Sequence, residues 1–296
     1  MLLVRRAKRN SMASQVHITG ASGRSGVAVC RSLLADGVPF VPVVRDASKW
    51  NATGIDVSPR IADLTDPSRL RVALADATLI VSCAHARHAP AVLAAAPTDA
   101  RFVFLGSTRK FTGWPDAHGN GVLAGEAGFL ASGRSGVMLH PTMIYGAQGE
   151  DNVQRLATLL RRLPLVPLPG GGKALVQPIH QDDVTRAIRA ALDRKWDEAC
   201  SVVIAGPAAL PYADFVRAIA AAAGQREPRI VALPAGALMA LAGVLRYMPL
   251  LPRIRPAEIR RLLEDKSFDV RPMIDTLGFR PMPLREGLAR TFTGRS

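Results

Sequence analysis

The sequence predicts a doubly wound α/β fold, a parallel sheet covered by helices on both faces, followed by a smaller and mostly helical C-terminal lobe. Two features carry this prediction. Short, continuously apolar runs alternate with helical patterns through the first two-thirds of the 296 residues, which is typical of strands buried on both faces. The first apolar run leads into a glycine-rich loop, Gly20 to Gly26, and then into a helical pattern. This is the context in which such a loop binds phosphate.

The expected elements follow one another in alternating order. We expect a strand at 15–20, a helix at 26–37 that Gly37 stops, and a second strand at 40–45. The pattern continues with a strand ending within 60–66, with strands at 78–84, 101–107 and 136–146, and with helices at 67–76 and 89–99. Parallel strands need crossover helices of this kind, so the alternation indicates βαβ units.

After Gly146 the pattern loosens. We expect helices at 151–164 and 181–195, a turn leading into a strand at 169–180, and a last strand at 200–206. From Leu210 onward the elements are expected to be mostly helical and broken by prolines. In a fold of this kind the ligand lies where two lobes meet, at the carboxyl ends of the strands.

Composition and charge limit the class of protein. The formal net charge of +14 favours anionic ligands, but no aromatic platform for bases accompanies it, so no nucleic-acid partner is expected. Cys30, Cys83 and Cys200 are too far apart for a disulfide framework or a structural zinc site, which fits a reducing cytoplasm. No histidine or acidic pair has the spacing of metal ligands, so no metal is expected.

No apolar run reaches the ~18 residues that span a membrane, so no transmembrane segment is expected. The nearest candidate, 232–252, is interrupted by Pro234, Arg246 and Pro249. We interpret it as a buried or interface-forming amphipathic helix, with peripheral contact to a membrane surface as the alternative. Residues 1–11 carry four basic side chains and are expected to form a disordered tail. No pattern indicates an oligomeric state.

The glycine loop has the three glycines that a dinucleotide-binding turn needs. One glycine supplies an unusual φ, one lets the backbone approach a pyrophosphate, and one lets helix and strand pack closely. Gly20, Gly23 and Gly26 are the candidates for these roles. The helix that follows points free N–H groups at the anion. The sequence therefore predicts a bound dinucleotide.

The residues after the second strand indicate which dinucleotide is bound. An acidic residue there binds the ribose 2′-OH of NAD, whereas an arginine accommodates a 2′-phosphate. Arg45 occupies this place, Lys49 follows four residues later, and Arg24 lies in the glycine loop. These cations favour NADP, while the adjacent Asp46 leaves NAD as the alternative.

Together these motifs resemble the short-chain dehydrogenase/reductase superfamily in its extended and atypical branches. The resemblance spans residues 15–288 and rests on the order of "TGASGRSG", "VRDASK", "ADLTD", "LGST", "HPTMIYG" and "QPIHQDDVTRAI". The closing stretch, 263–288, is similar to the tail of NAD-dependent epimerase/dehydratase-like proteins. It is also similar to the subgroup that includes a complex I accessory subunit.

We divide the chain into the tail (1–11), a dinucleotide-binding Rossmann domain (12–205) of which 147–178 contributes partly to the substrate lobe, and a C-terminal substrate lobe (206–296). The resemblance implies that Asp63 and Leu64 border the adenine. The full set of implied cofactor contacts is Gly20, Ser22, Gly23, Arg24, Gly26, Arg45, Lys49, Asp63, Leu64, Ala84, Ser107, Pro141 and Met143. Three polar residues are expected to cap and orient the helix at the lobe junction, namely His180, Asp182 and Asp183.

The acid–base pair of the superfamily, a tyrosine followed four residues later by a lysine, is absent from the sequence. In the superfamily the lysine lowers the pKa of the phenol, which moves a proton while hydride moves to or from the nicotinamide. Alignment on Glu126 places His118 at the tyrosine position and Val122 at the lysine position. Ser107 remains at the position of the serine that orients the carbonyl.

Two interpretations of His118 follow. It is either a substitute acid or base, with Lys110 or Arg109 polarising a substrate oxygen, or a residue of a polar loop with no catalytic role. His85 either faces the cofactor or is a satisfied loop histidine. The leading expectation is an atypical NAD(P)-dependent oxidoreductase or epimerase-like enzyme acting on a small carbonyl or sugar-type substrate. The alternative is a protein that senses NADP(H), or assists assembly, without turnover.

Overall fold

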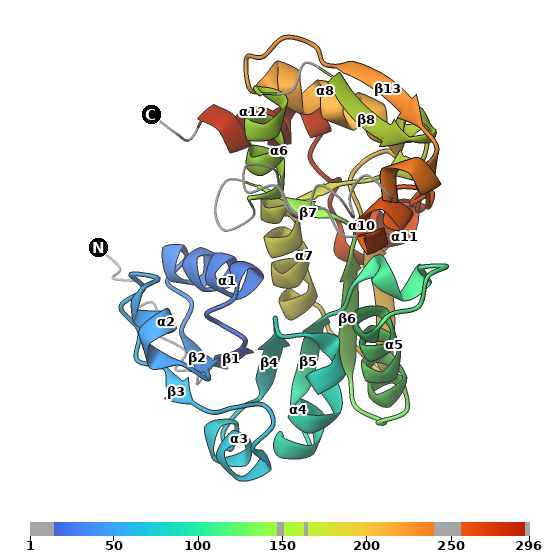
Figure 1. Ribbon diagram of the computed structural model, residues 1–296. Helices are drawn as coiled ribbons and strands as arrows, with labels where there is room; N and C mark the ends of the chain where they lie inside the picture. Colours follow the sequence, from blue (N-terminus) through green and yellow to red (C-terminus); the bar gives the residue numbers. More distant parts are fainter. Residues whose placement is uncertain (1–14, 147–150, 163–164, 240–255, 294–296) are drawn as a thin grey trace, which may run out of the picture.

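The centre of the molecule is a seven-stranded sheet. In the computed structural model, which describes residues 15–146, 151–162, 165–239 and 256–293, the strand order is β11-β6-β5-β4-β1-β2-β3. Every neighbouring pair in this sheet is parallel. The chain winds outward from β1 in one direction and from β4 in the other, which confirms the expected doubly wound fold (Figure 1).

The strands coincide with the apolar runs of the sequence. They are β1 (Val16–Thr19), β2 (Phe40–Val44), β3 (Arg60–Ile61), β4 (Leu79–Ser82), β5 (Arg101–Leu105), β6 (Gly136–Pro141) and β11 (Ala199–Ile204). Every residue of β1, β2 and β6 is buried. Continuous burial follows from helices on both faces, which explains why these strands are mostly apolar instead of alternating; the buried polar exceptions are His17, Thr19 and His140.

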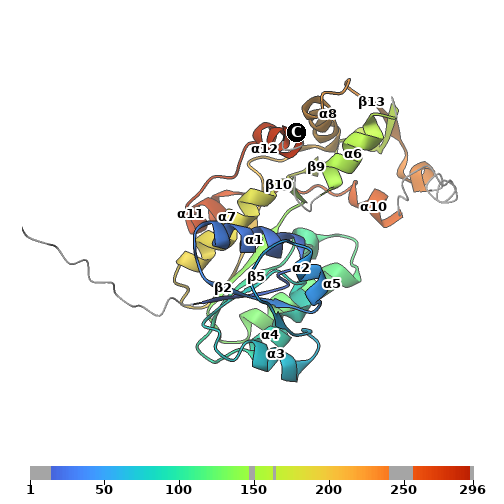
Figure 2. The ribbon, with the colours of Figure 1, turned by 90° about the vertical axis from the view of Figure 1, so that its left-hand side faces the viewer.

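Helices cover the sheet on both faces (Figure 2). One layer contains α1 (Arg24–Ala35) and α7 (Gln181–Asp193), and the other contains α3 (Pro67–Ala73), α4 (Ala89–Ala95) and α5 (Ala117–Leu130). Val29 and Ile188 belong to one buried cluster, whereas Leu70, Val92 and Phe129 belong to another. The sheet therefore separates two apolar cores, as a three-layer α/β fold requires.

A smaller lobe follows the sheet domain and has a third buried cluster around Phe215, Ile219 and Leu288. Its helices are α6 (Asn152–Leu160), α8 (Tyr212–Ala222), α10 (Pro256–Arg261), α11 (Arg271–Leu277) and α12 (Leu284–Thr293). Three two-stranded sheets accompany them, formed by β7 (Ile144–Tyr145) with β10 (Ile179–His180), β9 (Leu175–Val176) with β12 (Leu210–Pro211), and β8 (Leu165–Pro169) with β13 (Arg229–Leu233). The expectation of a mostly helical lobe missed β12 and β13, because strands of 2 and 5 residues carry little periodic signal.

The chain returns to the sheet domain near its end. Met273 of α11 is fully buried in the same cluster as Val29 and Ile188. Met282 then donates its backbone N–H to Asp183 Oδ2 at 2.7 Å. Sheet domain and lobe are thus connected by segments that are distant in the sequence.

Two expectations fall partly or wholly outside the described residues. The basic tail, 1–11, lies outside them, and so does the part 240–252 of the apolar stretch. Within the described ranges, no helix is long and apolar enough to cross a membrane. The same ranges contain no group of three or more His, Cys, Asp or Glu side chains that could hold a metal ion.

Candidate functional site

The glycine loop lies at the carboxyl end of β1 and packs against the end of β4. Gly20 has a φ of +69°, and a Cβ on it would lie 2.7 Å from the backbone nitrogen of Ala84. A Cβ on Gly26 would overlap the carbonyl oxygen of Gly20. Both positions therefore require glycine, and the loop lies pressed against the sheet.

Helix α1 presents its amino end to this loop. Gly23 is the N-cap, and no side chain caps the first turn. The N–H groups of that turn are the donors that a phosphate needs at a helix N-terminus. Ser22 and Arg24 flank Gly23, and a guanidinium nitrogen of Arg24 lies 3.6 Å from Asp151 Oδ1. The loop and the uncapped helix together fit the pyrophosphate of a dinucleotide.

The end of β2 lies beside the loop, because β1 and β2 pair in parallel register. Arg45 and Lys49 are both exposed there, the first directly after β2 and the second in α2 (Ala47–Asn51), a short helix that we did not expect. Asp46 caps this helix, since its Oδ1 accepts hydrogen bonds from the N–H groups of Ser48 at 2.9 Å and Lys49 at 3.2 Å. The Asp46 carboxylate is the group that would have to bind the ribose 2′-OH of NAD. It is thus already hydrogen-bonded to the backbone.

Asp63 follows β3 and faces Arg45, with 3.8 Å between Oδ2 and a guanidinium nitrogen. Its carboxylate also accepts hydrogen bonds from the N–H and the hydroxyl of Thr65, at 2.9 and 2.7 Å. These bonds, together with the charges of Arg45 and His88, hold the pKa of Asp63 below its ordinary value. Leu64 next to it is half-buried.

The carboxyl ends of β4, β5 and β6 bring the remaining expected contacts to the same edge of the sheet. Ser82 of β4 lies opposite Thr19 on one side and opposite Phe104 on the other. The expected contacts at or after the ends of these strands are Ala84, Ser107, Pro141 and Met143. The structure therefore places every implied cofactor contact at or near the carboxyl edge, where ligands bind in this fold.

Ser107 joins this edge to a buried polar network. It caps a single turn of 3₁₀-helix, η2 (Thr108–Phe111), and its N–H donates to Nδ1 of His140 at 3.2 Å. His140 Nε2 lies 3.1 Å from Glu126 Oε1, and the same oxygen is paired with the ammonium group of Lys110. Lys110, which we considered as a group that polarises a substrate oxygen, is thus paired with Glu126 in this structure.

The charge states in this network follow from burial. His140 is fully buried, and burial followed by the charge of Lys110 lowers its pKa to about 4. Burial opposes ionisation of Glu126, but hydrogen bonds from Lys110 and Ser201 and the nearby positive charges lower the pKa of Glu126 overall. The network therefore contains a neutral imidazole between a carboxylate and the backbone of Ser107.

His118 lies in the first turn of α5, so its interpretation as a loop residue is wrong. Asp116 starts this helix by accepting a hydrogen bond from the N–H of Gly119 at 2.8 Å, and it also pairs with Arg109. Nδ1 of His118 lies 3.1 Å from Nε2 of His85. Burial, followed by the charges of nearby arginines, lowers the pKa of His118 below its ordinary value.

Val122, at the position of the superfamily's lysine, is 1% exposed and packs in the cluster with Phe129. The next turn of α5 thus faces the core, where a lysine would be buried without a partner. Among the described residues, Lys110 is the lysine paired with Glu126. It comes from η2 and not from the Val122 position in α5. The structure accordingly offers a histidine pair at this edge and no tyrosine–lysine pair.

A segment of the C-terminal lobe, residues 261–268, reaches this site and is called the bridging segment below. Glu264 accepts hydrogen bonds from the hydroxyl of Thr112 and the N–H of Gly113, both at 2.7 Å. Phe268 packs against Phe111 with ring centroids 5.6 Å apart. The lobe is therefore attached directly to the turn that follows Ser107.

The lobe junction on the other side is held as expected. His180 caps α7, with Nδ1 accepting the N–H of Asp182 at 3.2 Å. Asp183 is fully buried and binds the backbone of Met282. The expectation is confirmed for His180, which caps the helix, and for Asp183, which joins α7 to the C-terminal segment. The Asp182 side chain instead forms ion pairs with His180 and Arg290.

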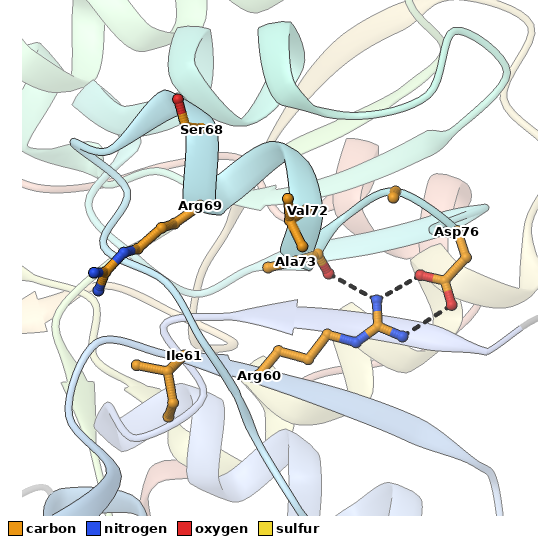
Figure 3. Close-up of a pocket in the computed structure, with 8 residues that line it drawn as sticks. Arg60, Ile61, Ser68, Arg69, Val72, Ala73 and Asp76 are labelled. Atoms are coloured by element: carbon orange, nitrogen blue, oxygen red, sulfur yellow. Dashed lines mark hydrogen bonds and ion pairs between the residues drawn. The ribbon is translucent and has the colours of Figure 1, made fainter.

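A separate hollow of about 720 Å³ lies at the β3 edge of the sheet (Figure 3). Arg60 and Asp76 form an ion pair on its floor, and Ile61, Arg69 and Val72 also line it. None of the expected cofactor contacts is among its lining residues. We therefore place the candidate site at the carboxyl edge and not in this hollow.

Comparison with known proteins agrees with this placement. Residues 20–113 match a family model described as NAD(P)H-binding, so this part of the chain, from the glycine loop to the turn after β5, is an NAD(P)H-binding domain. The search of curated proteins found no match. The match to the NAD(P)H-binding family model confirms the prediction of a nicotinamide dinucleotide.

Solved structures with the same fold cover nearly the whole chain. The NADPH-dependent quinone oxidoreductase QOR2 of Escherichia coli, complexed with NADPH, has a TM-score of 0.73 at 18% identity, over 94% of this chain and 100% of that one. MoeE5 with UDP-glucose and NAD gives 0.71 at 19%, over 94% and 97%. UDP-glucose 4-epimerase of Thermotoga maritima gives 0.70 at 14%, over 94% and 97%. At these identities the likeness establishes the fold, which is the one the sequence resemblance implied.

Sequence reasoning missed the partners that hold the candidate residues. His140 was not considered, and His85 was not connected with His118. The sequence contained a signal for the contact between His85 and His118, because Gly121 and Gly125 are four residues apart in α5. Glycines at this spacing indicate a helix face that another segment approaches closely.

Proposed function

We propose that the protein is an NADP(H)-dependent oxidoreductase or epimerase-like enzyme that acts on a small carbonyl or sugar-type substrate. The observation that carries this proposal is the histidine pair at the carboxyl edge of an NAD(P)H-binding domain, with His118 at the position of the superfamily's tyrosine. Ser107 lies at the end of the neighbouring strand. The glycine loop and the amino end of α1 would hold a nicotinamide dinucleotide here, which would supply the hydride chemistry of such an enzyme.

The preference for NADP over NAD rests on the groups at the end of β2. Arg45 and Lys49 are exposed there and can reach a 2′-phosphate. Asp46, which would have to bind a ribose 2′-OH, already accepts two backbone hydrogen bonds as the cap of α2. The ion pair between Arg45 and Asp63 is long, at 3.8 Å, so the Arg45 guanidinium can turn toward a phosphate.

The contacts of the chain's own residues support the following roles in this proposal. The amino end of α1 and the glycine loop bind the pyrophosphate. Ser107, fixed through its N–H by His140, orients a substrate oxygen with its hydroxyl. His118 donates a hydrogen bond to that oxygen, which a positioned group needs for acid–base catalysis. The bridging segment closes the site on the side of η2 and excludes water.

The second candidate function is binding of NADP(H) without turnover, in sensing or assembly. The observation that favours it is Val122, which puts a buried apolar side chain where the superfamily has its catalytic lysine. Without that ammonium group, a tyrosine-type proton transfer has no support. The two functions share the cofactor site and differ in whether a substrate reacts.

The experiment that separates them is a screen of NADPH oxidation with aldehydes, ketones, quinones and nucleotide sugars. Quinones and nucleotide sugars are included because solved structures of the same fold include a quinone oxidoreductase and proteins complexed with UDP-sugars. Loss of a positioned acid typically costs 10²–10⁴-fold in rate, and we expect His118→Ala to lose about this much. Turnover unaffected by His118→Ala would remove His118 from the mechanism, and tight cofactor binding without any turnover would favour sensing or assembly.

A cytoplasmic location and a soluble state without detergent stay proposals. Co-sedimentation with anionic liposomes tests the alternative for the stretch 232–252. Salt-resistant, stoichiometric pelleting would contradict our preference for a packed helix.

A further inference from the structure

His85 and His118 come from different elements and meet at the carboxyl edge. His85 follows β4 and caps η1 (Ala86–His88), a single turn of 3₁₀-helix, whereas His118 lies in the first turn of α5. Nε2 of His85 is 3.1 Å from Nδ1 of His118, and the rings meet edge to face with centroids 4.4 Å apart. A contact of this length between two nitrogens needs one hydrogen between them, so the tautomers of the two rings are linked.

A backbone amide decides the tautomer of His85. The N–H of Arg87 donates to Nδ1 of His85 at 3.1 Å. A backbone N–H can only donate, so this Nδ1 carries no proton, and the neutral ring carries its proton on Nε2. That Nε2–H donates to Nδ1 of His118. The proton of a neutral His118 is consequently on its Nε2.

Two glycines of α5 allow the pair to form. A Cβ on Gly125 would overlap the carbonyl oxygen of Ala86, and a Cβ on Gly121 would lie 2.9 Å from Cε1 of His85. A larger residue at either position would move α5 away from η1 or turn the His85 ring. The contact between the two rings therefore depends on how closely the two elements pack.

Charged groups around the pair oppose its protonation. They are Arg87 and His88 from η1, Arg109 from η2 and Arg261 from α10. Burial and then His118 and the neighbouring cations lower the pKa of His85 to about 4, and burial and the three arginines lower the pKa of His118. Asp116 offsets part of the charge of Arg109. Both rings are accordingly neutral at neutral pH.

We propose that His85 is a positioning residue that holds His118 as a neutral hydrogen-bond donor, with the His118 Nε2–H offered to the substrate oxygen. The inference deepens the proposed function and rests on it for the substrate. Within the described part of the chain, no hydrogen bond of His118 Nε2 is formed. A neutral imidazole donor polarises a carbonyl but takes up no proton through the same nitrogen. The pair therefore suits a carbonyl substrate better than an alcohol.

Nitrogen NMR of the isotope-labelled full chain reads the tautomer directly, and six histidines keep the spectrum assignable. In the wild type we expect the His118 Nε2 protonated and its Nδ1 bare, with a His118 pKa below its ordinary ~6.5. His85→Asn keeps an acceptor for the Arg87 N–H, because asparagine is a good cap, but it has no Nε2. In this variant we expect mixed His118 tautomers and a His118 pKa raised towards its ordinary ~6.5.

His88→Asn is the matched control, because His88 belongs to the same turn but contacts Arg87 and not His118. It should leave the His118 tautomer unchanged. Gly121→Ala tests the pair without removing either ring, since the added Cβ should turn His85 and give the same mixed tautomers. Ala127→Ser, which adds one atom on an exposed part of α5, should have no effect.

A proton on Nδ1 of His118 in the wild type would overturn the proposal. So would a His118 tautomer and pKa that His85→Asn leaves unchanged. These readouts need no substrate, so a failure of the proposed function would be seen separately, as absence of turnover with the tautomer still locked. Where a substrate is found, kcat/KM for its reduction in the wild type should depend on His118 protonation only below the ordinary histidine pKa of ~6.5. In His85→Asn this dependence should move up towards that pH.

Discussion

At the scale of single residues, the contacts that each site residue makes with its neighbours restrict what that residue can do. Gly20 and Gly26 have no room for a side chain, so their positions serve the approach of backbone to backbone. Asp46 is occupied as a helix cap, whereas the neighbouring Arg45 makes a long ion pair with Asp63. His140 is buried and neutral, and its Nδ1 accepts a hydrogen bond from the N–H of Ser107.

Gly26→Ala should destabilise the fold and weaken cofactor binding. The added Cβ overlaps the carbonyl oxygen of Gly20, so α1 must move away from the loop. We expect a cost of about 1–3 kcal/mol in unfolding free energy, as for other overpacked sites, together with weaker NADPH binding. Chemical denaturation and calorimetric titration measure the two effects. Gly236→Ala is the control, because a Cβ there meets nothing within 4 Å, and an equal loss in both variants would contradict the prediction.

Arg45→Ala should remove most of the preference for NADPH over NADH. A charge-assisted hydrogen bond to the 2′-phosphate contributes about 1.5–3 kcal/mol, which is roughly a 10- to 150-fold change in Kd. Calorimetric titration with both cofactors measures it, and NADH affinity should stay within about threefold. Arg217→Ala in the C-terminal lobe, where Arg217 pairs with Asp214, is the control. Equal affinity of the wild type for the two cofactors would refute the idea.

At the scale of elements, η1, η2 and α5 form one packed unit beside the sheet. α5 lies against η1 through Gly125 and is tied to η2 through the pair of Lys110 and Glu126. This packing sets the distance between His85 and His118, and it also holds Ser107 over His140. Disturbing the unit should therefore affect stability and site geometry together.

Glu126→Gln should destabilise the protein by about 3 kcal/mol, because it leaves the Lys110 ammonium group buried without a counter-charge. Lys110 and Glu126 are only 9% and 10% exposed in their side chains. The double variant Glu126→Gln with Lys110→Met should recover much of this loss, since both charges are then gone. Urea denaturation at neutral pH measures the free energies of unfolding. A double variant less stable than Glu126→Gln would show that the pair is not the cause.

Stability should fall as the pH is lowered from about 6.5 towards 4, and His140 should account for part of the fall. The pKa of His140 is about 4 in the folded protein and ~6.5 when unfolded. Between these values the unfolded state binds the extra proton, so acid favours unfolding by up to about 3 kcal/mol through this residue. His140→Gln, which cannot titrate, should show a smaller loss between pH 7 and pH 5 in urea melts. An identical slope in both proteins would rule out this role of His140.

At the scale of the whole molecule, two C-terminal segments attach to the sheet domain at different places. α11 and the residues after it pack on α7, whereas the bridging segment binds the turn after β5. Both connections use residues from the last 40 or so positions of the chain. The bridging segment is therefore attached to the sheet domain beside the candidate site.

Glu264→Ala should loosen the bridging segment and weaken substrate binding while leaving cofactor binding intact. It removes two hydrogen bonds to a charged acceptor, from Thr112 and Gly113, each worth about 1.5–3 kcal/mol at most. Hydrogen exchange should rise in residues 108–113 and 261–268. Asp265→Ala is the control, because Asp265 binds the Leu175 N–H within the lobe. Unchanged hydrogen exchange at 108–113 in Glu264→Ala would show that Glu264 does not hold the bridging segment against this turn.

The sequence by itself determined the strands of the central sheet, the helices α1, α3, α4 and α7, and the class of cofactor, but it did not indicate α2 or α5. These features depend on neighbours along the chain: a continuous apolar run predicts a buried strand, and three glycines between a strand and a helix predict a phosphate loop. The capping of α7 by His180 was predictable for the same reason, since a cap acts over two or three residues.

Only the tertiary structure decided which side chains meet. His85 and His118 are 33 positions apart, and so are Ser107 and His140, while Glu264 lies 152 positions from Thr112. No local pattern records such pairings, because they depend on the depth to which helices and turns pack. Here the glycines of α5 set that depth against η1. The sequence therefore indicated a cofactor and a missing tyrosine, whereas the contact between His85 and His118 depends on the packing of η1 against α5.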